Sequence, residues 1–151
     1  MVSQSEIKRL REETGVSMSV CNTALMEAGG DHDKALEILK SKGASVVAKK
    51  AGRTLGAGTI LAYIHSTKNI GALVELDSES DFVSKSEDFV ALAYDIAMHV
   101  SATDPESPAQ LLEESFVKNP DMTIRQLIEG ATQKFGERIE LVRFVRYAVG
   151  K

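Results

Sequence analysis

The stretch TILAYIHSTKNIGALVELD, residues 59–77, changes the period of the sequence from helical spacing to alternation and decides the fold class. It holds two runs of apolar and β-branched residues, 59–66 and 69–77, which Thr67-Lys68 separates. Two such runs joined by a short connection are typical of an antiparallel β-hairpin. Helical patterns precede and follow this stretch, so we predict an α+β fold.

The predicted hairpin is followed by SESDFVSKSEDFV, residues 78–90, which contains Asp-Phe-Val twice. Ser84-Lys85-Ser86-Glu87 has the form of a capping box, so we predict that a helix starts there and that Phe89 packs in its apolar stripe. Phe82 precedes this cap, in a loop between strand end and helix start. An aromatic side chain buries about 150–250 Å² where it finds a partner. Phe82 is therefore buried either by the fold or by another molecule.

The remaining C-terminal sequence predicts two helices and a third strand. A short helix begins at Ser107-Pro108, a connection surrounds Asn119-Pro120, and a longer helix spans Thr123 to Phe135. The stretch ERIELVRFVRYAV, residues 137–149, completes a small antiparallel three-stranded sheet, and both of its faces are partly apolar. One face can cover the helices while the other needs a different cover, so the pattern suggests self-association.

The N-terminal part predicts three short helices joined by glycine turns. Ser3, Ser17 and Asp31 are the expected N-caps, and the expected stops are glycines at positions 15, 29, 30 and 43. We therefore expect a three-helix, ubiquitin-associated-like module over residues 1–43. A basic, glycine-containing linker over residues 44–58 and an α+β core over residues 59–151 follow it.

Composition limits the class of protein. The single cysteine, Cys21, excludes an intrachain disulfide, and no apolar run resembles a signal peptide or a membrane span, so we expect a cytoplasmic protein. The net charge of -4 argues against a general nucleic-acid binder. Residues 56–121 hold 3 Lys/Arg against 12 Asp/Glu, so the acid gathers in the middle of the chain.

No pattern of catalytic residues stands out. His32, His65 and His99 fall in three separate predicted elements, Cys21 lies on an apolar helix face, and no Gly-x-Ser-x-Gly turn is present. The glycines at 52, 56 and 58 lack the preceding strand and the following Gly-Lys-Ser/Thr of a phosphate loop. We therefore predict a protein that is not an enzyme and that needs no metal or cofactor.

Several segments together carry a resemblance to a known family. They are LREETGVSMSVCNTAL, AGGDHDKALEILKSKG, AKKAGR, VELDSESDFVSKSEDF, AMHV and GERIELVRFVRY. In this order, and over nearly the whole chain, they resemble bacterial translation elongation factor Ts. Each segment is a weak pattern alone, but their shared order is specific.

The resemblance implies a guanine-nucleotide exchange factor that binds elongation factor Tu, GDP-bound or nucleotide-free, and promotes GDP release without forming or breaking a covalent bond. The N-terminal module would dock on the nucleotide-binding domain of that partner, at positions matched here by Val16, Met18, Cys21, Asn22 and Lys50. A loop would displace Mg²⁺ and the phosphate-side contacts, and its residues here are Ser80, Asp81, Phe82 and Val83. Family members with one sheet subdomain tend to pair through it, which implies a homodimer through the core sheet.

The chain also departs from the family pattern. Val20, Asn22 and Thr23 stand where an acid and a pair of lysines are common, Ser80 stands where threonine is usual, and the segment from Glu106 to Ser115 is shorter than usual. An alternative function is a non-catalytic adaptor that joins a three-helix module to a dimerising core. An adaptor gives no reason for an exposed Asp-Phe pair between a strand and a helix.

Overall fold

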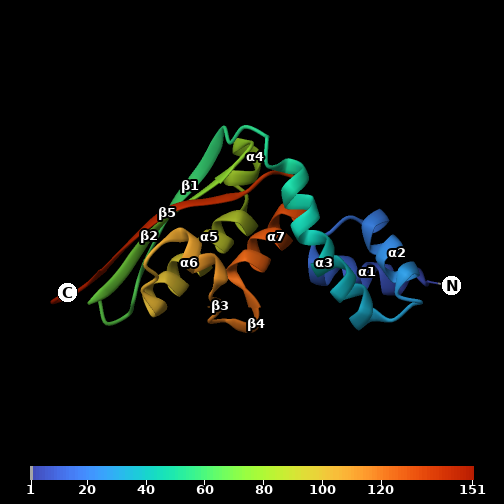
Figure 1. The fold of residues 1–151 in the computed structure, drawn as a ribbon, viewed down its shortest axis with the longest axis horizontal. Helices are drawn as coiled ribbons and strands as arrows, with labels where there is room; N and C mark the ends of the chain where they lie inside the picture. The colour runs from blue at the N-terminus through green and yellow to red at the C-terminus, as the bar shows by residue number, and fades with distance from the viewer. Residues whose placement is uncertain (1) are drawn as a thin grey trace. The chain divides into compact units, whose positions relative to one another are not determined.

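The computed structural model describes residues 2–151, which fold into two units. The first unit holds the chain as far as Gly52 together with residues 129–137, and the second holds residues 53–128 and 138–151. Figure 1 shows that the first unit is helical and that the second contains the sheet, which confirms the predicted α+β class.

Three helices open the first unit: α1 (Gln4–Thr14), α2 (Met18–Glu27) and α3 (His32–Lys50). The predicted caps are confirmed, since the side chains of Ser3, Ser17 and Asp31 each accept a backbone N–H from the first turn. Gly15 ends α1 with φ of 73°, a left-handed conformation that favours glycine. The core of the unit consists of Ile7, Leu10, Val16, Cys21, Ala24, Leu25, Ala35 and Leu39.

The predicted helix stop at Gly43 is wrong, because α3 continues to Lys50 through the first part of the expected linker. Gly43 is buried, and a Cβ atom there would lie 3.0 Å from both Glu129 and Gln133 of α7 (Ile124–Phe135). Gln133 also donates from its side-chain amide to the carbonyl oxygen of Leu39, at 2.9 Å. The glycine therefore permits close helix packing instead of ending the helix.

The sheet of the second unit contains β1 (Ala57–Ile64), β2 (Ile70–Ser78) and β5 (Glu140–Ala148) in the order β1-β2-β5. Both pairings are antiparallel, so the predicted hairpin and third strand are confirmed. Ala72, Val74 and Leu76 are buried on the face that packs on α5 (Glu87–Thr103). Figure 1 shows α5 and α6 (Pro108–Glu113) on the same side of the sheet. The other face, hereafter the outer face, has no such cover within residues 53–128 and 138–151.

Two details of the second unit correct the sequence prediction. The N-cap of α5 is Ser86, because Ser84 already belongs to α4, a single helical turn over Asp81–Ser84. The region around Asn119-Pro120 is not a plain connection but part of a small hairpin between β3 (Ser115–Phe116) and β4 (Asn119–Thr123).

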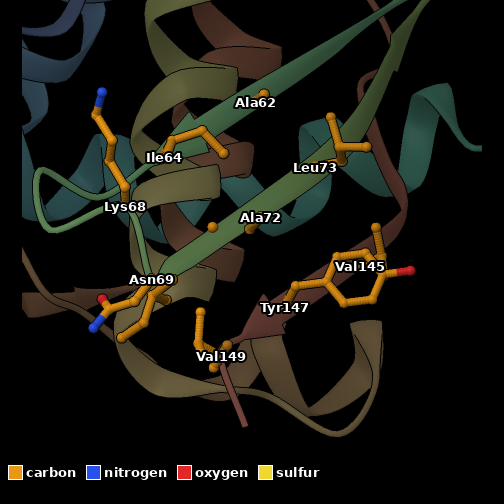
Figure 2. Close-up of a pocket in the computed structure, with 12 residues that line it drawn as sticks. Ala62, Ile64, Lys68, Asn69, Ala72, Leu73, Val145, Tyr147 and Val149 are labelled. Atoms are coloured by element: carbon orange, nitrogen blue, oxygen red, sulfur yellow. The ribbon is translucent and has the colours of Figure 1, made fainter. Parts of the chain in front are cut away.

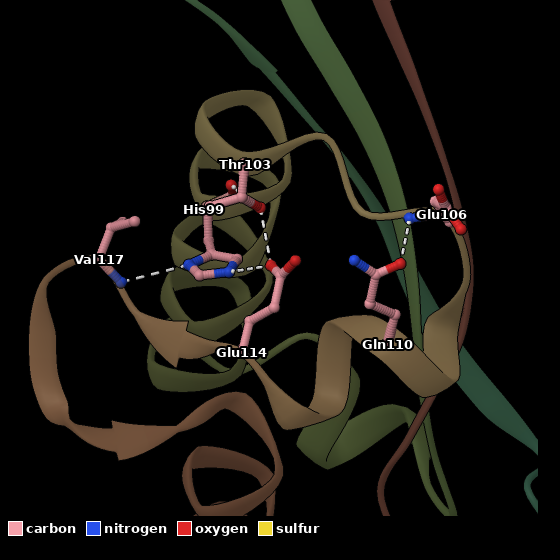
Figure 3. Close-up of polar contacts among 6 residues, drawn as sticks. All are labelled: His99, Thr103, Glu106, Gln110, Glu114 and Val117. Carbon is pink, nitrogen blue, oxygen red and sulfur yellow. Dashed lines mark hydrogen bonds and ion pairs between the residues drawn. The ribbon is translucent and has the colours of Figure 1, made fainter.

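His99 of α5 holds this small hairpin in place (Figure 3). The imidazole is fully buried, its Nδ1 accepts the backbone N–H of Val117 at 3.2 Å, and its Nε2 lies 2.9 Å from Glu114 Oε1. Since Nδ1 accepts, the proton lies on Nε2 and is donated to the carboxylate. Thr103 donates to the same carboxylate oxygen at 2.8 Å, so Glu114 ties the hairpin to two positions of α5.

We expect His99→Leu to lower the free energy of unfolding by about 2–4 kcal/mol, because it leaves the partly buried Val117 N–H without its acceptor and removes one of the two donors to Glu114. Urea unfolding followed by circular dichroism measures the loss. Thr103→Val is the matched control, since it removes one exposed donor to the same carboxylate and should cost less than about 1 kcal/mol. Equal losses in both variants would show that the imidazole is not the anchor.

Candidate partner-binding surfaces

The predicted loop over residues 80–83 forms a hydrogen-bonded helical turn. Ser80 caps α4 by accepting the Val83 N–H at 3.4 Å, and the Ser78 hydroxyl donates to the Ser80 carbonyl oxygen at 3.0 Å. The Ser86 hydroxyl donates to the Val83 carbonyl oxygen at 2.8 Å, and Thr59 of β1 donates to the Ser84 carbonyl oxygen at 2.6 Å. The serine hydroxyls therefore add to backbone hydrogen bonds, since the Ser80 and Val83 carbonyl oxygens also accept the N–H groups of Ser84 and Ser86.

This turn presents Phe82 to solvent. Val83 is buried and anchors the turn, Asp81 and Phe82 are exposed, and Phe82 is 88% exposed, more than any other exposed large apolar side chain of residues 2–151. The fold therefore does not bury Phe82. A fixed, exposed aromatic side chain is the kind of residue that dominates protein–protein interfaces.

The docking residues expected in the first unit differ in solvent exposure. Met18 is 41% exposed, and Asn22 and Lys50 are half-buried. Val16 and Cys21 are buried, and the Cys21 thiol donates to the Val16 carbonyl oxygen at 3.5 Å. Burial also raises the pKa of the Cys21 thiol, which keeps the sulfur protonated. These two side chains can shape the surface from below but do not lie on it.

A hollow of about 730 Å³ lies in the first unit beside these residues. Its basic lining residues are Arg11, Lys42, Lys50 and Lys134, and its apolar ones include Val16, Val20 and Val46. Val20, at a position where the family commonly has an acid, is 40% exposed. Of this set, only Val16 and Lys50 are docking residues predicted from the sequence, because no local pattern brings residues 11 and 134 together.

The outer face of the sheet carries a second hollow, of about 460 Å³ (Figure 2). Its apolar side chains come from all three strands, and those drawn in Figure 2 include Ile64, Leu73, Val145, Tyr147 and Val149. Tyr147 and Val149 are 74% and 77% exposed. The outer face therefore exposes a contiguous group of apolar side chains.

The same outer face carries acids at its other end. Asp77 lies opposite Glu140 on β5, and Arg143 donates to Glu75 at 2.8 Å. Burial, with contributions from Glu75 and Glu140, raises the pKa of Asp77 to about 6. Ionised Asp77 therefore opposes folding, and the folded chain loses stability as the pH rises from about 4 through about 6.

We expect Asp77→Asn to remove this loss. The variant should gain about 1 kcal/mol over the parent chain at pH 7.5, after allowance for solvent screening, and little at pH 4.5. Urea unfolding at both pH values checks this, with Glu106→Gln as the control at an exposed carboxylate. A difference between Asp77→Asn and parent that does not vary with pH would contradict the expectation.

Comparisons with known proteins identify the family. The sequence model described as Elongation factor TS matches residues 32–110. The protein named Elongation factor Ts from Carboxydothermus hydrogenoformans is 37% identical, over 100% of this chain and 90% of its own length. Proteins of the same name from Desulforamulus reducens and Moorella thermoacetica are 37% and 36% identical, over 99% and 100% of this chain and 90% and 97% of their own lengths. The chain belongs to the elongation factor Ts family.

Within the elongation factor Ts family this chain is short. Its alignment with the Carboxydothermus hydrogenoformans protein runs over 196 positions, 45 more than the 151 residues of the chain. A shortening is predicted between Glu106 and Ser115, and in this segment the structure has the six-residue helix α6.

Residues 2–151 contain no cluster of three or more His, Cys, Asp or Glu side chains able to hold a metal ion. They also contain no helix that is both long and apolar enough to cross a membrane.

Proposed function

We propose that this protein is the guanine-nucleotide exchange factor for elongation factor Tu in translation elongation and that it promotes GDP release. Membership of the elongation factor Ts family supports this proposal. The observation that carries its mechanism is Phe82, which stands 88% exposed on a turn whose backbone is hydrogen-bonded on both sides.

In this mechanism Phe82 acts as a wedge. Mg²⁺ requires near-ideal octahedral geometry, so a displacement of about an ångström in one ligand-bearing segment weakens its binding and that of the phosphates. Phe82 supplies the contact area, and the Asp81 carboxylate can accept hydrogen bonds from the displaced segment. Because Ser80 and the buried Val83 fix the turn, little ordering cost opposes the wedge when it enters the partner.

The first unit would hold the partner while the wedge acts. Val20 provides an apolar contact in the hollow, where Lys50 and Arg11 provide positive charge. Met18 is a further exposed apolar side chain of the same unit. Such a surface fits an acidic, partly apolar element on the nucleotide-binding domain. Thermodynamic linkage requires the two effects to be equal: the factor by which the exchange factor lowers the affinity of the partner for GDP is the factor by which GDP lowers its affinity for the exchange factor. The complex that contains both is therefore transient.

We also propose that two copies pair through the outer face of the sheet. The support is the apolar hollow around Tyr147 and Leu73, because a twofold contact lets the same patch cover itself. The helices cover only the opposite face of the sheet in the second unit.

The test is the release of fluorescent GDP from purified elongation factor Tu with catalytic amounts of this protein. Accelerated release supports exchange activity. Binding to elongation factor Tu without acceleration would favour the alternative, a non-catalytic adaptor. The rigid exposure of Phe82 favours exchange, because an adaptor has no need of a fixed aromatic side chain at this junction.

A further inference from the structure

The strand β1 lies at one edge of the sheet, and its free side offers an unbroken row of backbone groups. Within the part of the chain that the structure describes, β1 pairs only with β2. The N–H of His65 donates to the Ile70 carbonyl oxygen at 2.9 Å, which fixes the hydrogen-bonding register of the hairpin. In this register the odd-numbered residues of β1 bond to β2. The N–H and C=O groups of Gly58, Ile60, Ala62 and Ile64 therefore point away from the sheet.

Nothing in the sequence of β1 protects this edge. Exposed edges are usually blunted by charged side chains, proline or a bulge. The strand AGTILAYI has no charge and no proline, and its pairing with β2 runs without a register shift. The opposite edge strand, β5, carries Arg143 and Arg146 and has a bulge in its pairing with β2. The two edges of the same sheet thus differ, and only the β1 edge is open to another strand.

A hollow of about 550 Å³ lies beside this edge, on the face of the sheet that the helices cover. Leu61 of β1 forms one wall, and Val90 and Tyr94 on the outward side of α5 form the other. Lys85, Glu87, Asp95 and Lys118 surround it, and Lys118 and Asp95 are paired at 3.2 Å. The hollow therefore has an apolar centre and a rim of both charges, which suits an uncharged apolar side chain.

We propose that an extended peptide segment of a partner protein adds to β1 as a fourth strand. Its backbone would pair with the free groups of Gly58, Ile60, Ala62 and Ile64, and one of its alternate side chains, apolar and uncharged, would enter the hollow between β1 and α5. A strand edge beside a helix-walled groove is a recurrent geometry for peptide recognition, in which main-chain bonds give affinity and the groove gives specificity. This site is separate from Phe82 and from the hollow of the first unit, and it adjoins the outer face, where the side chains of Ala62 and Ile64 line the hollow of about 460 Å³.

The hollow favours a peptide over a second copy of the chain. Two β1 strands can pair antiparallel about Leu61, but such a twofold contact brings hollow against hollow and sets Lys85 and Lys118 toward their own copies. The apolar walls would then gain no side chain from the partner. A peptide from another protein satisfies the backbone and fills the hollow in one contact.

The probe is the synthetic peptide IGALVELDS, acetylated and amidated, which copies residues 70–78, the strand that β1 already accepts on its other side. Full-length ¹⁵N-labelled protein is titrated with this peptide to about 1 mM, and amide shifts and hydrogen exchange are recorded. We expect saturable binding with new protection at Ile60, Ala62 and Ile64. Ala62→Pro removes an outward N–H without touching the β1–β2 bonds, so it should weaken binding at least tenfold, whereas the matched control Ala62→Thr should bind as the parent does.

Retained protection at Leu61 and Tyr63 shows that Ala62→Pro keeps the hairpin folded. A fully N-methylated version of the peptide gives an independent test on the parent protein, because it keeps the side chains but has no N–H donors, and we expect it not to bind. No binding of IGALVELDS at 1 mM, shifts confined to the outer face, or equal binding of the N-methylated peptide would each overturn the proposal. Protection of the same amides without peptide, rising with protein concentration, would overturn it in favour of a second copy.

Discussion

Phe82→Ala is expected to lower the acceleration of GDP release from elongation factor Tu by about 30- to 150-fold, equivalent to about 2–3 kcal/mol, the loss typical of a central aromatic contact. The reason is that Phe82 is exposed in the free protein and has its whole surface available to the partner. The measurement is stopped-flow release of fluorescent GDP at several concentrations of the exchange factor. A reduced maximal rate, with half-saturation little changed, would place the loss in the displacement step and not in docking.

Two controls separate the wedge from simple misfolding. Because Phe82 is exposed, Phe82→Ala should leave the thermal midpoint within about 2 °C of the parent. Val117→Ala removes another exposed apolar side chain, this time from the small hairpin of the second unit, and should leave exchange unchanged. Full stimulation by Phe82→Ala would contradict the proposed mechanism even if exchange activity itself were present.

The elements that the sequence predicted well are those with strong local signals. The hairpin of β1 and β2 follows from alternation, and the starts of α1, α2 and α3 follow from capping residues. Gly43 misled the prediction, because a glycine that ends a helix and a glycine that admits a neighbouring helix look the same in one sequence. Only the approach of Glu129 and Gln133, more than 80 residues later in the chain, distinguishes the two.

The candidate surfaces, too, depend on contacts between residues that are far apart in the sequence. Phe82 could be found from sequence because a large aromatic side chain among serines and acids is unusual wherever the chain goes. The sequence could not show that the turn of Phe82 is helical and hydrogen-bonded, because Thr59 bonds to Ser84 from a strand 25 residues away. The basic hollow of the first unit was missed for the same reason, as Lys134 joins Arg11 only through the fold. Local sequence patterns therefore identify the exposed residue, whereas the contacts that hold its turn are visible only in the folded structure.

The exposed fractions also divide the docking residues implied by the family resemblance into a buried pair and a group at the surface. Val16 and Cys21 were grouped with Met18 and Lys50 as docking positions, yet the first two lie in the core. Substitution of Cys21 would therefore change docking only by disturbing the module. Variants of Met18, Val20 and Lys50, whose side chains are exposed or line the hollow, test docking without disturbing the core.

Tyr147→Asp is expected to abolish pairing of two copies through the outer face of the sheet. Tyr147 is 74% exposed and lies with Val145 and Leu73 around the apolar hollow in Figure 2. A twofold contact places each substitution in the interface twice, so a cost of about 2 kcal/mol per copy from burying a carboxylate becomes about 4 kcal/mol per dimer. That raises the dimer dissociation constant about 1,000-fold, and sedimentation equilibrium over a wide range of concentration measures it.

The control for this prediction is Tyr94→Asp, which puts the same charge at a tyrosine that is 45% exposed on α5, away from the outer face. It should leave the parent dimer constant unchanged, because its side chain would not enter the interface. A parent protein that stays monomeric at high concentration would contradict the pairing itself. A dimer that survives Tyr147→Asp would show that the copies meet elsewhere, and the apolar outer face would then need another cover, since water contact along so many apolar side chains is unfavourable.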